Sequence, residues 1–293
     1  MFRYPLYLIG QFIVNHLPVK YSYKIAMFLS DLQYYFSFQD RKAVRDNLRI
    51  IVGEQKNLDN LAKEVFRNFG RYLVEFFSMV KVVDEKYIRN NVRVENIHFV
   101  NQVLDQGKGG IILTAHVGNF ELGAAVLSAL DFPVHAVALP HKDRSVNNFF
   151  NSQRELKGVT VIPSNIAMRR CINAIHNNEL VGLVADRDFG EHGTRLPFLG
   201  KTSSIPRGAA VFSLSTEAPL IPTFLLREAN GTFRLVIEEP IYPPKSNRGE
   251  IDESMVFQLM QRYTKVIESK IRSYPTQWLM FRRFWLEGVK EGV

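Results

Sequence analysis

The stretch Gly109–Leu130, GGIILTAHVGNFELGAAVLSAL, decides the fold because it joins a short apolar run, a small polar turn and an amphipathic continuation. Residues 111–113 are bulky and uninterrupted, which is typical of a strand covered on both faces. After the turn, Leu122, Val126 and Ala129 return at helical spacing. The stretch therefore predicts a strand, a turn and a helix.

The turn carries His116, Gly118, Asn119 and Glu121. Open α/β sheets bind ligands at the carboxyl ends of their strands, where His116 is expected. We expect His116 to act as a general base, with Glu121 holding its imidazole in the right tautomer. Side chains five residues apart do not share a straight helix face, so this pairing requires His116 in the turn and Glu121 in the first helical turn. Alternatively, Glu121 only complements the helix dipole, with Asn119 as the N-cap.

Composition indicates a globular chain without structural disulfides. The 293 residues are 46% hydrophobic, enough for a large core in one domain with appendages. The single cysteine, Cys171, excludes an internal disulfide and is expected to be a buried helix residue. The seven histidines show no metal-ligand spacing, so we predict no metal site.

The formal net charge of +8 favours an acidic partner. Nucleic acid, an anionic membrane surface, an acidic carrier protein and a phosphorylated substrate all fit that charge. The chain has no long basic run and no RNP-like or finger pattern, and this argues against nucleic acid.

The amino-terminal residues suit a membrane interface. Residues 2–14 are apolar, but Arg3, Gly10 and Gln11 interrupt them and no cleavage site for a signal peptide follows. No uncharged apolar run reaches the length of about 18 residues that a membrane span needs. The aromatic and aliphatic character of residues 1–31 predicts a segment lying in the interface. The alternative is an ordinary amphipathic helix packed on the core.

Periodicity then divides the chain into two regions. Residues 1–90 are predicted to form a helical, membrane-associated segment, and residues 91–293 an α/β domain. Strands are expected near residues 92, 111, 134, 159 and 180, and helices over 97–105, 145–157 and 166–177. This alternation predicts a mixed, mostly parallel central sheet flanked by helices.

The carboxyl-terminal third begins with a connection over residues 186–204 that is rich in glycine and charge. Loops of this length inside a compact domain are usually functional. A helix over 206–216, a hairpin turning at 229–231 and a last helix over 251–271 are expected to follow.

Five blocks in order carry a family resemblance. They are the stretch from His116 to Glu121, DRDFGEHGTRLPFLG, SIPRGAA, APLIPTF and PTQWLMFRRF. With them the chain resembles the bacterial late acyltransferases of lipid A biosynthesis, within the wider lysophospholipid acyltransferase superfamily. The likeness covers almost the whole length.

The resemblance implies transfer of a fatty acyl chain from an acyl carrier protein or acyl-CoA to a hydroxyl of a membrane glycolipid, without a cofactor or metal. It implies His116 as the general base and Glu121 as its orienting carboxylate. N–H groups of Gly118 and Asn119 would then receive the oxyanion. The place implied is the cytoplasmic face of the bacterial inner membrane, with the protein peripheral or anchored by its N-terminus.

The resemblance also implies a set of substrate-binding residues, comprising Arg154, Asp186, Arg187, Asp188, Gly200, Pro206, Arg207 and Gly208. Guanidinium forks suit phosphate oxygens, so the three arginines are the candidates for a phosphate-bearing partner. The alternative for residues 186–188 is that they only cap and close a turn.

Two departures leave the acceptor open. Leu139 stands where many members of the family carry an arginine, and Phe281 where they carry a histidine. A lipid A precursor, another glycolipid such as a phosphatidylinositol mannoside, and a lysophospholipid are therefore alternative acceptors. Two further hypotheses are a nucleotide-sugar glycosyltransferase with Asp186 and Asp188 as an Asp-x-Asp metal site, and a peripheral protein that only docks on anionic bilayers.

Overall fold

The computed structural model describes residues 3–54, 56–188, 193–244 and 251–285. Its centre is a seven-stranded sheet in the order β1-β9-β8-β2-β5-β3-β4, in which only the β8–β9 pair is antiparallel. The strands are β1 (Val92–Glu95), β2 (Gly110–Thr114), β3 (Val134–Ala138), β4 (Thr160–Pro163), β5 (Leu180–Val184), β8 (Leu220–Arg227) and β9 (Phe233–Ile237). The expected mixed, mostly parallel sheet is confirmed.

Strand β2 lies in the middle of the sheet, as its apolar run predicts. Ile111 and Leu113 belong to one core and Ile112 to the other, because successive side chains of a strand point to opposite faces. The first core packs against α9 (Ala167–His176), α10 (Gly208–Thr216) and α11 (Glu253–Ser273), and it buries Cys171 as expected. The second packs against α6 (His98–Leu104), α7 (Phe120–Ala129) and α8 (Arg144–Glu155).

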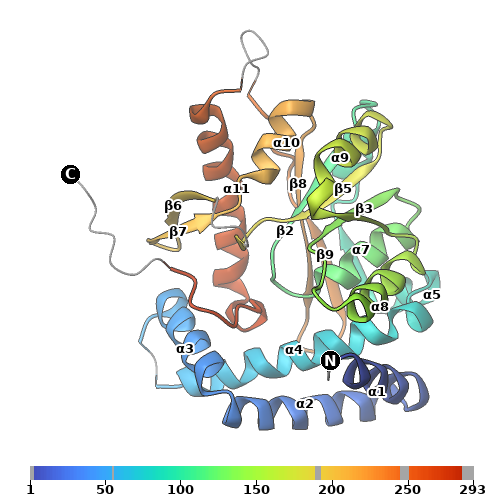
Figure 1. The fold of residues 1–293 in the computed structure, drawn as a ribbon, viewed down its shortest axis with the longest axis vertical. Helices are drawn as coiled ribbons and strands as arrows, with labels where there is room; N and C mark the ends of the chain where they lie inside the picture. Colours follow the sequence, from blue (N-terminus) through green and yellow to red (C-terminus); the bar gives the residue numbers. More distant parts are fainter. Residues whose placement is uncertain (1–2, 55, 189–192, 245–250, 286–293) are drawn as a thin grey trace.

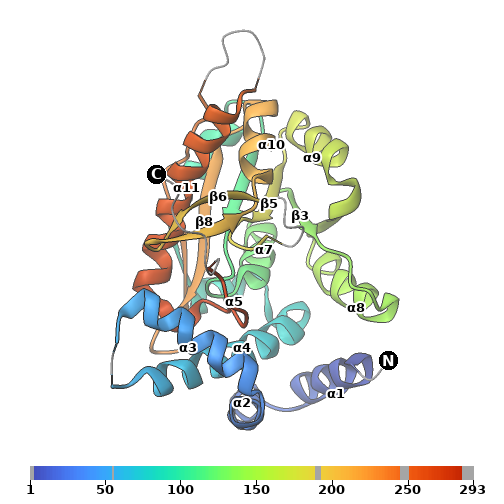
Figure 2. The same ribbon diagram turned by 60° about the vertical axis from the view of Figure 1, so that its left-hand side comes forward.

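The amino-terminal residues are helical, as predicted, and form α1 (Arg3–His16), α2 (Val19–Phe36), α3 (Phe38–Val52) and α4 (Leu58–Val82), followed by α5 (Glu85–Asn91). Helix α4 joins them to the sheet, because its Val74 and Phe76 enter the second core. Figures 1 and 2 show α1 to α3 at one end of the molecule, below the sheet in both views.

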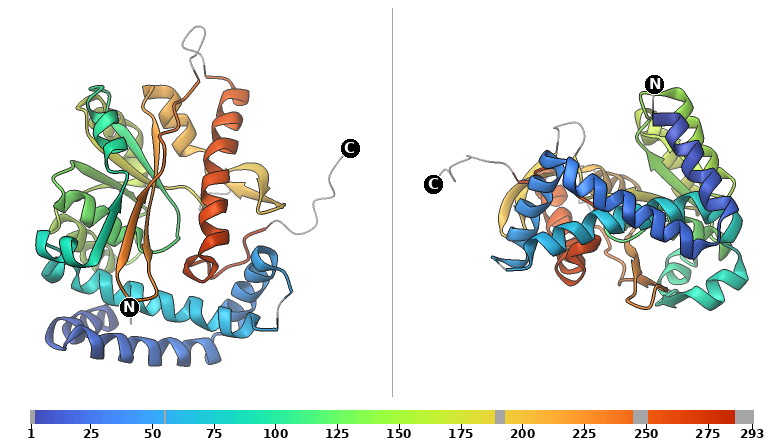
Figure 3. Two further views of the ribbon diagram at one scale, coloured as in Figure 1. Left: turned by 180° about the vertical axis from the view of Figure 1, so that it is seen from behind. Right: turned by 90° about the horizontal axis from the view of Figure 1, so that it is seen from below.

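Large apolar side chains remain exposed on α1 and α2, which both pack against α4. They include Leu6, Ile9, Phe12, Phe28, Leu29 and Phe36. Helix α2 crosses over α4 when the molecule is seen from below (Figure 3, right). No helix among the described residues is both long and apolar enough to cross a bilayer. Membrane association of this segment stays a prediction.

The connection after β5 is not a plain loop. Residues 189–192 lie outside the described residues, but the rest forms an antiparallel hairpin of β6 (Thr194–Phe198) and β7 (Lys201–Ile205). Leu196 and Phe198 are buried while Arg195 and Pro197 are exposed, a strand alternation that the glycine and charge around it concealed. The expected hairpin that turns at residues 229–231 is confirmed and is formed by β8 and β9.

Candidate active site

The turn after β2 is held in a tight backbone conformation by β8. Gly118 has a φ of +70°, and a Cβ at this position would lie 2.0 Å from the backbone oxygen of Leu225. Only glycine fits such an approach. Asn119 follows and caps α7, its side-chain oxygen accepting the N–H of Leu122 at 3.0 Å. Gly118 and Asn119 therefore each have a structural role in this turn, Gly118 through its close contact with β8 and Asn119 as the cap of α7.

Backbone hydrogen bonds fix the turn from two sides. The N–H of Gly118 donates to the carbonyl of Gln277 at 3.0 Å, and the N–H of Asn119 donates to the carbonyl of Leu225 at 2.9 Å. The carbonyl of His116 accepts the N–H of Leu279 at 2.8 Å. In this conformation both N–H groups already have carbonyl acceptors within the fold, and the oxyanion role expected of Gly118 and Asn119 stays a prediction.

Strand register brings His116 and Asp186 together. Strands β2 and β5 are parallel neighbours with Thr114 opposite Val184, and each residue of the pair stands two positions beyond those strand ends. Nδ1 of His116 lies 2.7 Å from Oδ1 of Asp186. The backbone N–H of His116 donates to both carboxylate oxygens at 3.1 Å, and the indole N–H of Trp278 donates to Oδ2 at 2.9 Å.

The Asp186 carboxylate is inaccessible to solvent, whereas 18% of the His116 side chain is exposed. Burial works to raise the pKa of the Asp186 carboxyl. The charge of His116 and the hydrogen bonds from His116 and Trp278 outweigh burial and hold that pKa below its ordinary value. Asp186 is thus a buried carboxylate that fixes the orientation of a partly exposed imidazole.

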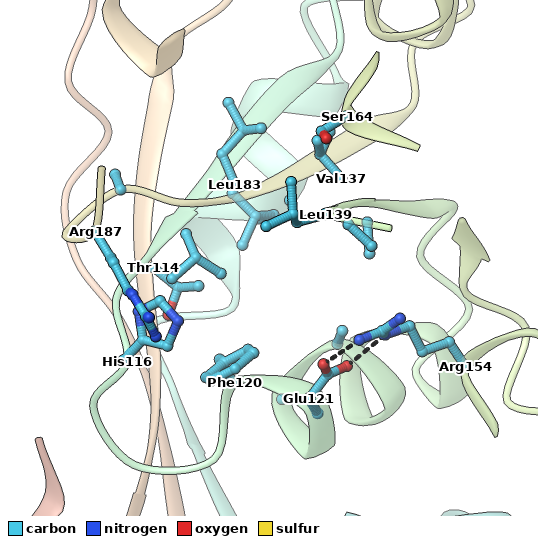
Figure 4. Close-up of a pocket in the computed structure, with 18 of the residues that line it drawn as sticks. Thr114, His116, Phe120, Glu121, Val137, Leu139, Arg154, Ser164, Leu183 and Arg187 are labelled. Atoms are coloured by element: carbon cyan, nitrogen blue, oxygen red, sulfur yellow. Dashed lines mark hydrogen bonds and ion pairs between the residues drawn. The ribbon is translucent and has the colours of Figure 1, made fainter. Parts of the chain in front are cut away.

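Glu121 has a different partner from the one predicted. Its two carboxylate oxygens accept hydrogen bonds from Arg154 of α8, from Nε at 2.8 Å and from a terminal nitrogen at 2.5 Å. Figure 4 shows Glu121 turned toward Arg154, with Phe120 on the side of His116. The expectation that Glu121 orients His116 is corrected: Glu121 is in the first turn of α7, but its side chain is held toward α8, and Asp186 holds the imidazole.

His116 and the Glu121–Arg154 pair line one cavity of about 920 Å³ (Figure 4), while Asp186 is buried against His116 and is not among the lining residues. Its walls are mainly apolar side chains of the sheet, α4 and α7, including Leu73, Ile112, Leu127, Val137, Leu183 and Leu225. The volume lies in the upper part of the range of about 300–1,000 Å³ that small-molecule sites occupy. Such a space suits a long apolar group next to His116.

The predicted substrate residues divide between the cavity and the surface. Arg154, Arg187, Pro206 and Gly208 line the cavity. Burial and then the nearby Arg282 lower the pKa of Arg187, against the opposing charge of Asp186. In Figure 4, Arg187 lies beside His116.

Four other predicted residues are not among those that line this cavity, and one of them is Asp186, which is buried against His116. Gly200 sits in the β6–β7 turn with a φ of +87°, a conformation that favours glycine. Oδ2 of Asp188 accepts from the Gly193 N–H and the Ser204 hydroxyl, both at 2.8 Å, and this closes the base of the hairpin. Arg207 pairs with Glu253 of α11 at 2.7 Å.

Trp278 is the site residue that the sequence reasoning missed. It lies in the resemblance block PTQWLMFRRF, but nothing in that block indicates a contact with a residue 92 positions earlier. The nearby Phe281, a departure from the family pattern, packs edge-on against Phe66 at 5.0 Å between ring centres. Among the described residues, no group of three or more histidines, cysteines, aspartates or glutamates is placed to hold a metal ion.

An imidazole oriented by a carboxylate activates hydroxyls for attack, and the adjoining apolar cavity suits a fatty chain better than a sugar or a nucleotide. These features define the class of group-transfer enzymes with an apolar substrate. A family model described as "Bacterial lipid A biosynthesis acyltransferase" matches residues 1–287, and the chain belongs to that family of acyltransferases. The resemblance found in the sequence blocks is confirmed.

Curated relatives agree with the family. The chain is 25% identical to a phosphatidylinositol mannoside acyltransferase of Mycobacterium tuberculosis, over 97% of this chain and 89% of the relative. It is also 25% identical to the protein of that name from Mycolicibacterium smegmatis, over 85% of this chain and 80% of the relative.

Proposed function

We propose that the enzyme transfers a fatty acyl chain from the thioester of an acyl carrier protein or acyl-CoA to a hydroxyl of a membrane glycolipid. The observation that carries the proposal is the 2.7 Å contact of His116 with the buried Asp186 beside an apolar cavity. The names of the mycobacterial relatives support a glycolipid acceptor.

In this mechanism Asp186 accepts a hydrogen bond from the Nδ1–H of His116, so Nε2 is the nitrogen that takes the proton of the acceptor hydroxyl. The hydroxyl oxygen attacks the thioester carbonyl and forms a tetrahedral oxyanion. Collapse of that intermediate breaks the carbon–sulfur bond, and the imidazolium returns its proton to the departing thiolate. No cofactor takes part in these steps, which balance with ester and free thiol as products.

The apolar cavity would hold the acyl chain, and Arg187 is the candidate for an anionic substrate group. Arg187 lines the cavity next to His116 and keeps its charge at any physiological pH. Arg154 is engaged by Glu121, and Arg207 by Glu253 outside the cavity lining. Of the three arginines predicted to contact phosphate, we propose Arg187 for this role because it lines the same cavity as His116 and follows Asp186 directly in the sequence.

Attachment to an anionic membrane, at the cytoplasmic face, is part of the proposal. Its support is the set of exposed apolar side chains on α1 and α2, among them Phe12 and Phe28, together with the net charge of +8. Co-sedimentation with anionic vesicles tests it. Wild-type protein that stays in the supernatant at low salt would contradict it.

The Asp-x-Asp alternative has less support from the side chains. The oxygens of Asp186 face His116 and Trp278, while Asp188 closes the hairpin, so the two carboxylates serve separate contacts.

The test is an assay of purified enzyme with labelled acyl carrier protein and labelled acyl-CoA, each with membrane glycolipid, followed by mass spectrometry of the lipid. We expect an added ester-linked acyl chain with at least one donor, unchanged by a metal chelator. A product formed only from a nucleotide sugar, and lost in chelator, would favour the glycosyltransferase instead.

A further inference from the structure

A buried polar cluster lies behind the turn that carries His116. Its centre is Glu75, a carboxylate in the middle of α4 whose side chain is only 4% exposed. A buried charge costs several kcal/mol of desolvation, which an ion pair offsets only with good geometry and further hydrogen bonds. Because a buried carboxylate contributes little to the stability of a helix, the contacts of Glu75 point to another role for this residue.

Three side chains from three other elements meet this carboxylate. Arg227 of β8 forms an ion pair with Oε1, and Tyr23 of α2 donates to the same oxygen at 3.4 Å. Arg227 also donates to the Tyr23 hydroxyl at 3.0 Å. The remaining oxygen, Oε2, accepts from the side-chain amide of Asn119 at 2.7 Å.

Asn119 connects the cluster to the catalytic turn, three residues after His116. While its Nδ2 donates to Glu75, its Oδ1 accepts the N–H of Leu122 and starts α7. The side chain thus has one orientation that satisfies both contacts. If the amide rotated by half a turn, its oxygen would face the carboxylate and the helix would lose its cap.

Gln277 closes the arrangement from the other side. Its side-chain oxygen accepts the backbone N–H of Arg227 at 3.0 Å, and its side-chain nitrogen donates to the backbone carbonyl of Arg227 at 2.8 Å. The backbone carbonyl of Gln277 accepts the N–H of Gly118. Gln277 therefore links Arg227, the ion-pair partner of Glu75, to the backbone of the turn at Gly118.

We propose that Glu75 is a positioning residue for the acyl transfer, which sets the turn so that His116 faces the cavity. It acts through Asn119, and Arg227 and Tyr23 hold its carboxylate in place. The inference rests on the proposed role of His116. Because Tyr23 belongs to α2, the cluster also ties a helix with an exposed apolar face to the catalytic turn.

The test reverses the hydrogen bond between positions 75 and 119. Asn119→Asp keeps the acceptor that caps α7 but sets a second carboxylate against Glu75. We expect kcat to fall about 10- to 100-fold with little change in KM, since small misplacement of a catalytic group has effects of this size. The double variant Glu75→Gln/Asn119→Asp restores one donor and one acceptor with the same total charge, and it should recover most of kcat.

Several results would overturn the inference. They are a wild-type kcat for Asn119→Asp, or a double variant no faster than the single one although both show the wild-type circular dichroism spectrum. If Asn119→Asp does not fold, Tyr23→Phe replaces it: a kcat reduced about 2- to 5-fold at constant KM supports the inference, and an unchanged kcat contradicts it. A fully active His116→Ala would instead refute the proposed function itself.

Discussion

Two acid–base pairs contribute side chains to the cavity wall, and they differ in what the basic partner can do. Asp186 faces an imidazole, which can both accept and donate a proton, and Glu121 faces the guanidinium of Arg154, which stays charged. Asp186 has no exposed surface and Trp278 as an additional donor, while the ion pair spans two helices and is about a tenth exposed at each partner. The first pair is suited to proton transfer, and the second to holding α7 against α8.

The largest expected effect comes from removing the imidazole. His116→Ala should lower kcat toward the upper end of the factor of about 10²–10⁴ that a general base contributes, with KM for the donor little changed. Steady-state acyl transfer measures it. His98→Ala, at an exposed histidine of α6, is the matched control and should behave as wild type. Turnover by His116→Ala within a few-fold of wild type would show that the pair is structural.

Removing the orienting charge should have the next largest effect. Asp186→Asn keeps the size of the side chain but loses the carboxylate that favours the Nδ1–H tautomer of His116 and stabilises the imidazolium. We expect kcat to fall about 10²-fold. The exposed Asp105→Asn is the control. If Glu121→Gln lowered kcat more than Asp186→Asn did, the two pairs would have to exchange roles.

The comparison also shows what the sequence can and cannot predict. The apolar run of β2, the following turn and the helix were predicted because strand and helix periodicities are local properties of the chain. The partner of His116 was not, because it depends on which strand lies beside β2. Glu121 is five residues away and Asp186 is 70 away, yet the parallel register of β2 and β5 places the distant carboxylate in contact.

The hairpin β6–β7 was missed for a related reason. The glycine and charge around Leu196 and Phe198 conceal the alternation of these two buried residues, and Gly200 forms the turn of the hairpin. The N–H groups at the start of α7 have a similar history, because a helix start offers free N–H groups only if no neighbouring segment takes them. Here Leu225 and Gln277 supply the acceptors, and no local pattern predicts that.

Breaking the ion pair should reduce stability more than chemistry. Arg154→Met leaves the Glu121 carboxylate buried without its guanidinium, which we expect to lower the free energy of unfolding by about 3–5 kcal/mol. The double variant Glu121→Gln/Arg154→Met removes both charges and should recover most of that loss. Denaturant unfolding of the two variants measures the difference. Equal losses in both variants would mean that shape, not the unpaired charge, sets the cost.

The smallest effect is expected at Asp31 of α2, which pairs with Arg67 of α4 at 2.7 Å on a partly exposed surface. The hydrogen bond from Arg67 lowers the pKa of Asp31 against the effect of burial, with further help from Lys63. Because the folded pKa lies below the ordinary value of an aspartate, about 4, the pair adds stability above about pH 4 and loses it as the pH falls through the folded pKa. Asp31→Asn should therefore cost at most about 1 kcal/mol in urea unfolding at pH 7, and less near pH 3. A loss that stays the same at both pH values would mean that the amide disturbs packing between α2 and α4, and that the charge contributes nothing.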